Sequence, residues 1–533
     1  MLTSPSASSA YLMAVALSAW KRLLGPPGSD RLTVWLFLRG LGLIYAVAFL
    51  SLALQLPPLL GRDGLLPVQL YLERIAEASL APWWDVPSLM WISSGDGFML
   101  LLAWSGVALG LLLLSGHASA IHLLLLWILY SSFVNVGQLF YSYGWEILLL
   151  ETGFLAVFLC PVWRGGWRGH VGGCERIVLW LLRWLLFRVL FGAGLIKLRG
   201  DPCWRDLTCL LYHYETQPIP NPISPYLHAL PAFVHHFGVL FNHLVEVVVP
   251  VFYFAPYRMR RIAGGLTVLF QVLLVLSGNL SWLNWLTLVL CVPCFDDGLL
   301  HRILPASLIR RTVDTPSDAP SPMRGVATAG LLVLILSLSI SPVINLLSPG
   351  QMMNTSFDRL HLVNTYGAFG HIGKERDEII LLGTLDNAHD AAADWREYEF
   401  PCKPGDPSRP PCVVSPYHHR LDWQIWFAAM GDYRTQPWLL HLVYKLLHAD
   451  PEILGLLASD PFGGRRPRWI RADLYRYEFA PPVEDGWWRR RRLGPYLPPL
   501  SARDPSLQRI VESFGWPLLS STTVSSPPCA CSF

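Results

Sequence analysis

Residues 33–54 read TVWLFLRGLGLIYAVAFLSLAL, and this stretch decides the class of protein. It is apolar for the roughly 20 residues that a helix needs to cross a bilayer, with Arg39 as its one charged side chain. Across all 533 residues, 53% are hydrophobic and 15% are charged, whereas soluble proteins carry about a quarter charged residues. The mean hydropathy is +0.38. We therefore expect a protein that is embedded in a membrane.

Similar apolar runs recur along the chain up to residue 347. They occupy residues 98–114, 121–141, 145–162, 177–198, 233–254, 262–276, 282–295 and 326–347. Together with the first run they predict about nine spans, and fewer if the short ones are re-entrant or interfacial. After residue 350 the sequence becomes mixed and charged, as in a water-soluble domain.

The distribution of basic residues predicts which side each loop faces. Lys21, Arg22 and Arg31 precede the first run, which places the N-terminus in the cytosol by the positive-inside rule. The arginine-rich loops 163–176 and 256–261 then fall on the same side. An odd number of spans leaves the C-terminal region on the opposite, lumenal side.

These features divide the chain into four parts. We expect a cytosolic tail over residues 1–32, a polytopic transmembrane domain over 33–348, a lumenal α+β domain over 349–517 and a disordered tail over 518–533. The fold class is thus a multi-pass α-helical membrane protein with a C-terminal lumenal α+β domain. In that domain, alternation of apolar and polar residues predicts strands and amphipathic spacing predicts helices. The strands are expected at 360–369, 378–385, 395–401, 468–479 and 487–496, and the helices at 422–430 and 438–447.

Two kinds of residue favour a lumenal C-terminal domain. Asn354 begins an Asn-Thr-Ser glycosylation site just after the last span. Cys402 and Cys412 enclose a proline-rich loop that suits a disulfide, and Cys203 and Cys209 also fall on the lumenal side and could pair. The alternative for each pair is two free, buried thiols. Other cysteines lie near the cytosolic side, where thiols stay reduced: Cys160, Cys174, Cys291 and Cys294.

Ionisable residues inside the spans form a candidate polar cluster, because lipid makes each of them costly. Its members are Arg39, Glu146, Glu151, Arg183, Arg188 and Glu246. One hypothesis is a polar pocket with a working acid or base. The other is that Glu151 and Glu246 pair with arginines and fix the packing of the helices, while Lys197 extends its ammonium group to the interface. The cost of burial favours the second hypothesis.

The loop 199–231 is the most distinctive part of the membrane half. It gathers Asp201, Cys203, Cys209 and His213, which are residue types that bind metals, but without the paired spacing typical of zinc sites. We therefore favour a disulfide-tied loop and expect no metal and no cofactor. Cys291 and Cys294 have thioredoxin-like spacing, yet they lie in an apolar segment, so redox chemistry is disfavoured.

Arginines alternate with tryptophans at two places in the C-terminal domain. These candidate client-binding residues are Arg465, Arg466, Arg468, Trp469, Trp487, Trp488, Arg489 and Arg490. Arg and Trp are enriched at protein interfaces, although a solvated face is the other interpretation. The net charge of +3 gives no argument for nucleic acid, and no nucleophile elbow, P-loop or dinucleotide motif is present. The residues thus predict a membrane anchor carrying a non-enzymatic lumenal module.

Several long strings resemble the lipase maturation factor family. They are FGAGLIKLRGDPCWRDLTCLLYHYETQPIPNPISPY at 191–226, NVGQLFYSYGWEILLLETGFLAVFLCP at 135–161, SGNLSWLNW at 277–285, VNTYGAFG at 363–370, and CKPGDPSRPPC with SPYHHRLDW inside 402–423. The resemblance covers about residues 34–517. The CWRDLTC and VNTYGAFG strings are more similar to the founding branch of the family than to its paralogous branch.

This resemblance implies a function as well as a location. It implies a multi-pass glycoprotein of the endoplasmic reticulum membrane that acts as a chaperone for the folding and dimer assembly of secreted lipases. The implied partners are membrane lipid and the homodimeric lipoprotein, hepatic and endothelial lipases, met by the C-terminal domain. A shorter resemblance supports an alternative: GAGLIKL at 192–198 is similar to the vitamin K-dependent γ-carboxylase superfamily, in which the lysine matching Lys197 acts as a base.

Overall fold

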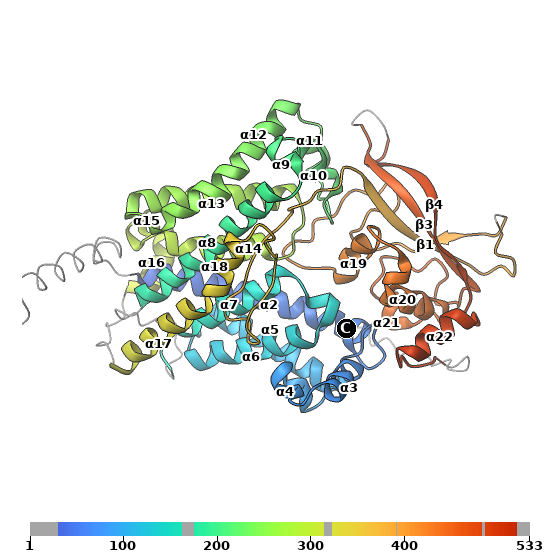
Figure 1. Cartoon of the computed structure of the whole chain (residues 1–533), viewed down its shortest axis with the longest axis horizontal. Coiled ribbons are helices and arrows are strands. Elements are labelled where there is room, and N and C mark those ends of the chain that lie inside the picture. The colour runs from blue at the N-terminus through green and yellow to red at the C-terminus, as the bar shows by residue number, and fades with distance from the viewer. Residues whose placement is uncertain (1–29, 163–174, 314–321, 391, 482–484, 520–533) are drawn as a thin grey trace, which may run out of the picture. The chain divides into compact units, whose positions relative to one another are not determined.

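A computed structural model describes residues 30–162, 175–313, 322–390, 392–481 and 485–519 (Figure 1). The expected tails, 1–32 and 518–533, fall mostly outside this range, as does Cys174. The chain forms two compact units. Unit 1 contains residues 1–54, 72–374 and 412–418, and unit 2 contains residues 55–71, 375–411 and 419–533.

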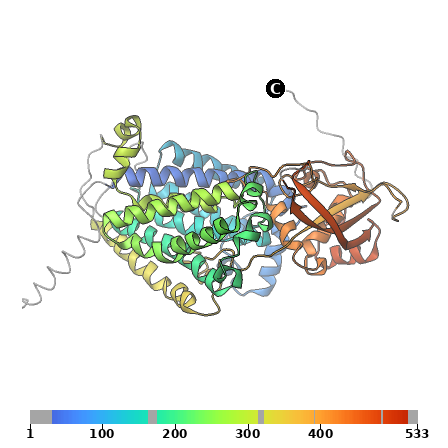
Figure 2. The same cartoon turned by 90° about the horizontal axis from the view of Figure 1, so that it is seen from above.

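Unit 1 is helical, and its long helices run in roughly the same direction (Figure 2). Its longer helices are α5 (Asp96–Ser115), α6 (Ala120–Val136), α7 (Gly144–Val157), α8 (Glu175–Arg199), α12 (Ala232–His243), α13 (Tyr257–Ser277) and α17 (Pro322–Leu338), together with most of α2 (Arg31–Leu60). Shorter segments complete the spans, namely η3 (Leu244–Val248), η4 (Val249–Phe254), α14 (Leu283–Cys291) and α18 (Ile340–Leu347). Gly42 lets α2 approach α5 closely, because an added Cβ would lie 2.5 Å from the Leu114 nitrogen.

Six helical segments of the described chain are long and apolar enough to cross a membrane, or seven if the bent pair at Leu283–Cys294 and Asp297–Ile303 counts as one span. This is fewer than the nine spans that the apolar runs predict. The runs at 121–141 and 145–162 form the short helices α6 and α7, of 17 and 14 residues. The run at 282–295 bends by 118° after Cys294. The expected fold class, a multi-pass helical membrane protein with a C-terminal α+β domain, is confirmed.

Ionic contacts identify the helix ends that share one end of unit 1. Arg176, at the start of α8, pairs with Asp30 at 3.0 Å, and Arg324, in α17, pairs with Glu175 at 3.0 Å. The Asp297 carboxylate accepts hydrogen bonds from the backbone of residues 32–33 at 3.0–3.1 Å. The starts of α2, α8 and α17 and the segment after α14 therefore lie together.

A different set of contacts marks the opposite end of unit 1. Arg199, at the end of α8, donates to Gln351 at 2.8 Å, and the Asp201 nitrogen donates to the Gly370 carbonyl at 2.8 Å. The Asn279 nitrogen, between α13 and α14, donates to the Ile219 carbonyl at 3.0 Å. Residues 279–297 consequently run from this end to the end that holds Asp30.

Residues 351–374, which we call the strap, belong to unit 1. Unit 2 resumes at Glu375, whereas the sequence predicts a domain boundary at 348/349. The strand expected at 360–369 is wrong: this part of the strap has no strand and only an isolated bridge between Ser356 and Asn364. The strap forms hydrogen bonds with helices of unit 1. It therefore has no neighbouring strand with which to form a sheet.

Unit 2 contains a four-stranded antiparallel sheet of order β2-β1-β3-β4 (Figure 1). The strands are β1 (Arg376–Thr384), β2 (Arg396–Glu397), β3 (Trp469–Phe479) and β4 (Trp488–Leu500). Helix α19 (Arg420–Ala428) packs against β1, and α20 (Pro437–Leu447) packs against β3. On the other face, Ile380, Leu382, Tyr477 and Trp488 form a buried cluster. The expected strands at 378–385, 468–479 and 487–496 are present, whereas that at 395–401 is reduced to the two residues of β2.

Residues 55–71 also belong to unit 2, although they follow the first span. Gln55 accepts a hydrogen bond from the Arg420 nitrogen at 3.0 Å, and the Leu65 carbonyl lies 2.9 Å from His441 Nδ1. Because these contacts join residues more than 360 positions apart, the sequence gives no local signal for them.

Candidate functional site

Glu151 and Arg188 form an ion pair inside unit 1, with their side chains 0% and 2% exposed. Arg188 also donates to the Asn364 carbonyl at 2.6 Å. Glu151 accepts hydrogen bonds from the Tyr366 hydroxyl at 2.8 Å and from the Asn364 nitrogen at 3.1 Å. Each charge thus has an opposite charge and further polar partners, which is what burial in a membrane protein requires.

This centre explains the VNTYGAFG string at 363–370. Asn364 and Tyr366 bring the strap to the ion pair, and the Cβ of any residue replacing Gly192 would lie 2.5 Å from the Tyr366 carbonyl. Trp204 Nε1 donates to the Phe369 carbonyl at 2.8 Å. The string therefore fixes the strap to helices α7 and α8 through buried polar contacts.

Lys197 forms a second buried ion pair. Its ammonium group lies 2.7 Å from both Glu246 carboxylate oxygens and 2.9 Å from Asn242 Oδ1, and it also faces the Trp204 ring at 4.9 Å. The lysine is 5% exposed, so the expectation that it extends to the interface is wrong. Glu246 pairs with this lysine and not with an arginine of the candidate cluster. It belongs to the π-helical turn η3, which interrupts the span.

The other members of the intramembrane cluster lie at separate places. Arg39 lies over the Trp35 ring at 4.9 Å, Arg183 donates to the Pro293 carbonyl at 2.8 Å, and the Tyr130 hydroxyl donates to Glu146. These contacts differ from those of the two ion pairs, so the six residues are distributed over several sites of the described chain.

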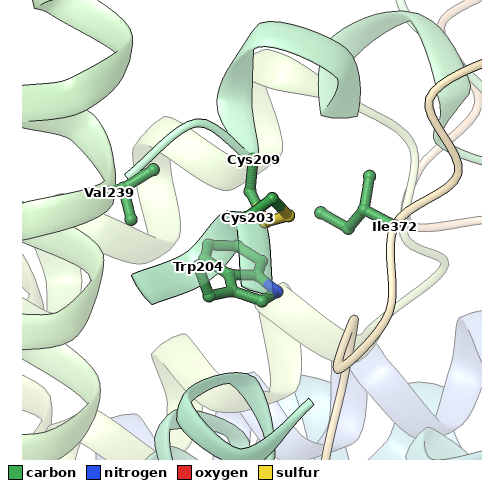
Figure 3. Packing of buried hydrophobic residues seen from close by; sticks show 5 residues of the cluster. All are labelled: Cys203, Trp204, Cys209, Val239 and Ile372. Carbon is green, nitrogen blue, oxygen red and sulfur yellow. A yellow bond between two sulfur atoms is a disulfide. The ribbon is translucent and has the colours of Figure 1, made fainter. Parts of the chain in front are cut away.

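Cys203 and Cys209 are joined in a disulfide that packs against Trp204, Val239 and Ile372 (Figure 3). Ile372 comes from the strap, so the disulfide-tied loop also contacts this segment. His213, in the same loop, is buried, and burial, followed by the nearby charge of Lys197, lowers its pKa to about 4. No group of three or more potential metal ligands is found among the described residues.

The other cysteines of the described residues also have defined states. Cys160, Cys291 and Cys294 are free and buried. Cys402 and Cys412 are each disulfide-bonded. Asn354 is exposed on the strap, and its side-chain oxygen lies 3.4 Å from the Gly367 nitrogen.

The candidate client-binding residues of unit 2 divide into exposed and structural ones. Trp488 is 4% exposed and belongs to the core cluster, so its assignment to a binding surface is wrong. Arg490 is half-buried and makes two hydrogen bonds of 2.7 and 2.8 Å to Glu397. Trp469 and Trp487 are partly buried. Those on the surface are Arg465, Arg466, Arg468 and Arg489.

Sequence reasoning missed Asp422, which joins two of the quoted strings. Its carboxylate accepts hydrogen bonds from the backbone nitrogens of Cys402 and Lys403 at 2.7 and 2.9 Å. Asp422 is buried, and burial raises its pKa. Both strings, CKPGDPSRPPC and SPYHHRLDW, are distinctive in the sequence. Neither of them indicates that Asp422 of the second string contacts the start of the first.

Comparison with known proteins gives a consistent result for both units. Residues 32–302 match the lipase maturation factor transmembrane domain, and residues 362–498 match the lipase maturation factor C-terminal domain. The chain is 48% identical to mouse lipase maturation factor 1, covering 92% of this chain and 90% of the relative. It is 47% identical to the human protein of that name, with 93% of each chain covered.

Human lipase maturation factor 2 is more distant, at 32% identity over 91% of this chain and 85% of its own. No solved structure matches. The greater similarity to the founding branch agrees with the CWRDLTC and VNTYGAFG strings. The matches to both family domains, and the relatives that are 47–48% identical over more than 90% of the chain, place the chain in the lipase maturation factor family.

Proposed function

We propose that this protein is a membrane chaperone of the endoplasmic reticulum that promotes the folding and dimer assembly of secreted lipases. The single observation that carries the proposal is the family match over both units, at 47–48% identity to proteins named lipase maturation factor 1. The proposed clients are the homodimeric lipoprotein, hepatic and endothelial lipases.

The arrangement of unit 1 supports an N-terminus in the cytosol and a C-terminal unit in the lumen. Asp30 lies at one end of the helices, and the strap that leads to Glu375 contacts the other end through Gln351 and Gly370. The short helices α6 and α7 follow one another as a pair, so they add either two crossings or none. Residues 279–297 join the two ends, which supports an odd number of crossings.

The chemistry of the two ends points the same way. Among the described residues, Arg176 and Arg261 lie near the Asp30 end, where they pair with Asp30 and Asp296, and the positive-inside rule assigns such an end to the cytosol. The disulfide of Cys203 and Cys209 lies beside the strap, where an oxidising lumen would maintain it. Protease treatment of sealed microsomes tests this orientation: a C-terminal tag should survive, and its digestion without detergent would contradict the proposal.

The buried contacts of Lys197 support a non-enzymatic role. Its ammonium group has acceptors on Glu246 and Asn242, and a lysine that acts as a base must instead present a neutral amine. The family match on both units gives no support to the carboxylase-like alternative. We therefore infer that Lys197 stabilises the fold.

Unit 2 is the proposed client-binding part, with its exposed arginines at 465, 466, 468 and 489 as the candidate contacts. A stop after Lys374 keeps the strap and removes all of unit 2 except residues 55–71, together with residues 412–418 of unit 1. We expect this truncated protein to lose co-purification with lipoprotein lipase. A full-length variant with these four arginines changed to glutamine should bind less lipase at normal abundance.

The matched control changes the same number of exposed arginines to glutamine, at positions of unit 2 outside the candidate set: Arg434, Arg491, Arg503 and Arg509. Equal loss of binding in the control would assign the effect to net charge. Undiminished lipase binding by the truncated protein, at normal abundance, would overturn the assignment to unit 2.

A further inference from the structure

Four large apolar side chains are exposed in the loop that precedes α5. Leu80, Trp83, Trp84 and Ile92 are 107%, 68%, 56% and 74% exposed, and we call them the Trp83 patch. Trp83 and Trp84 belong to the short helix α4 (Pro82–Asp85). Such a concentration of exposed apolar surface usually marks a contact with another molecule or with a membrane.

The segment that carries the patch is held in place by hydrogen bonds. Ser79 donates to Asp85 across the turn that contains Leu80. The Ser88 hydroxyl donates to the Ser132 carbonyl at 2.9 Å, and Asn135 Nδ2 donates to the Pro87 carbonyl at 2.8 Å. Hydrogen bonds to α6 therefore hold the backbone segment that carries the exposed side chains.

These hydrogen bonds also fix the level of the patch along the helices. Ser132 and Asn135 occupy the last turn of α6, which ends at Val136, and α5 begins at Asp96, four residues after Ile92. On α5, Leu101 and Trp104 are exposed on a span of 20 residues. Leu101 is five residues inside the helix, about 7.5 Å along its axis. The Trp83 patch thus lies near the level at which the lipid-facing surface of α5 ends.

Two charged side chains lie beside the patch. Arg359 pairs with Asp85 at 2.8 Å, and its guanidinium group lies over the Trp84 ring at 5.8 Å. A tryptophan with an apolar body next to charged groups at the end of a span is typical of the interface between lipid tails and headgroups. Neither bulk water nor the tail region alone would satisfy both kinds of side chain.

We propose that the Trp83 patch inserts into the interfacial region of the bilayer that unit 1 crosses, as an anchor additional to the spans. Lipid is the favoured occupant because the patch lies near the level at which the α5 span begins and carries tryptophans beside charged groups. The proposal goes beyond lipase maturation and holds whichever side the C-terminal unit faces. A lipase bound to the patch is the competing outcome.

Photo-crosslinking of the full-length protein in microsomes tests this proposal. Benzoylphenylalanine replaces Trp83 in one variant, Trp104 in a lipid-facing control and Phe427, an exposed residue of unit 2, in a second control. Lipid adducts are then measured by mass spectrometry. Because tryptophans concentrate at the interface, we expect lipid adducts at position 83 within about threefold of those at 104 and about tenfold above those at 427.

Absence of lipid adducts at position 83, or adducts with lipase alone, would overturn the proposal. The unsubstituted protein gives an independent readout in lipid nanodiscs. Hydroxyl-radical oxidation of Trp83 and Trp84 should be as low as that of Trp104. Heavy oxidation of both residues, with little at Trp104, would also overturn it.

Discussion

The buried ion pairs of unit 1 and the ion pairs on the sheet of unit 2 use the same residue types under different conditions. Glu151 and Arg188 are almost fully buried, whereas Arg396, in β2, and its partner Asp394 have side chains that are 47% and 64% exposed. A buried charge that loses its partner remains desolvated, but an exposed aspartate is still solvated by water. The buried and the exposed ion pairs should therefore differ greatly in their contribution to stability.

The largest effect is expected for Arg188→Leu, because Glu151 would remain buried without its counter-charge. Breaking a buried pair typically lowers the free energy of unfolding by about 3–5 kcal/mol. We expect much lower abundance and loss of the thermal transition of the purified protein. Arg176→Leu removes a partner of Asp30 whose side chain is 27% exposed, and it serves as the control. Equal abundance of the two variants would contradict the expected difference between a buried and a more exposed ion pair.

Lys197→Met should also destabilise unit 1, but less, because Asn242 Nδ2 still donates to Glu246 at 3.0 Å. We expect a loss of about 3 kcal/mol at most for this partly satisfied carboxylate. The double variant Lys197→Met with Glu246→Met removes both charges and should recover abundance and lipase maturation. Recovered abundance without recovered lipase activity would instead assign chemistry to Lys197.

A smaller effect is expected from acidification of unit 2. Burial lowers the pKa of His441 to about 3, against 6.5 in the unfolded chain. The unfolded state therefore binds a proton first, so this stabilising contribution is present above pH 6.5 and is lost as the pH falls. Between pH 7 and pH 5 we expect a loss of about 1–2 kcal/mol, measured by thermal unfolding.

The variant His441→Phe should flatten this pH dependence, because the buried ring stacks on Trp516 at 4.1 Å and phenylalanine preserves that contact. The exposed His389 is the matched control. If His389→Phe flattens the profile as much as His441→Phe does, the assignment to His441 is wrong.

The smallest effect is expected for Arg396→Gln. Arg396 and Asp394 are 47% and 64% exposed, and exposed ion pairs contribute about 0–1 kcal/mol. Urea unfolding should therefore change little, and lipase maturation should be normal. A loss above about 2 kcal/mol would show that this sheet surface behaves like a buried site.

Some parts of this molecule were predictable from local sequence. The long spans follow from the length of apolar runs such as 33–54, and β1, β3 and β4 follow from alternation. Cys203 and Cys209, only six positions apart, were expected to pair as one of two alternatives. In each case the deciding physical property lies within one short segment.

Other parts depend on contacts between distant residues. Residues 360–369 of the strap alternate as a strand would, but hydrogen bonds of this segment go to Glu151 and Arg188. Trp488 lies among exposed arginines in the sequence, and only its register opposite Phe479 places it in the core. Lys197 could have reached the interface, and its burial depends on Glu246 in a separate helix. Pairing of this kind leaves no local pattern.

The proposed role in lipase maturation is best tested by measuring secreted lipase activity. Lipoprotein lipase is expressed with this protein in cells that lack their own maturation factor, and activity is measured per unit of secreted lipase protein. We predict a clear rise with the full chain and no rise with Arg188→Leu. No rise with the full chain, when it is abundant in the endoplasmic reticulum, would contradict the account.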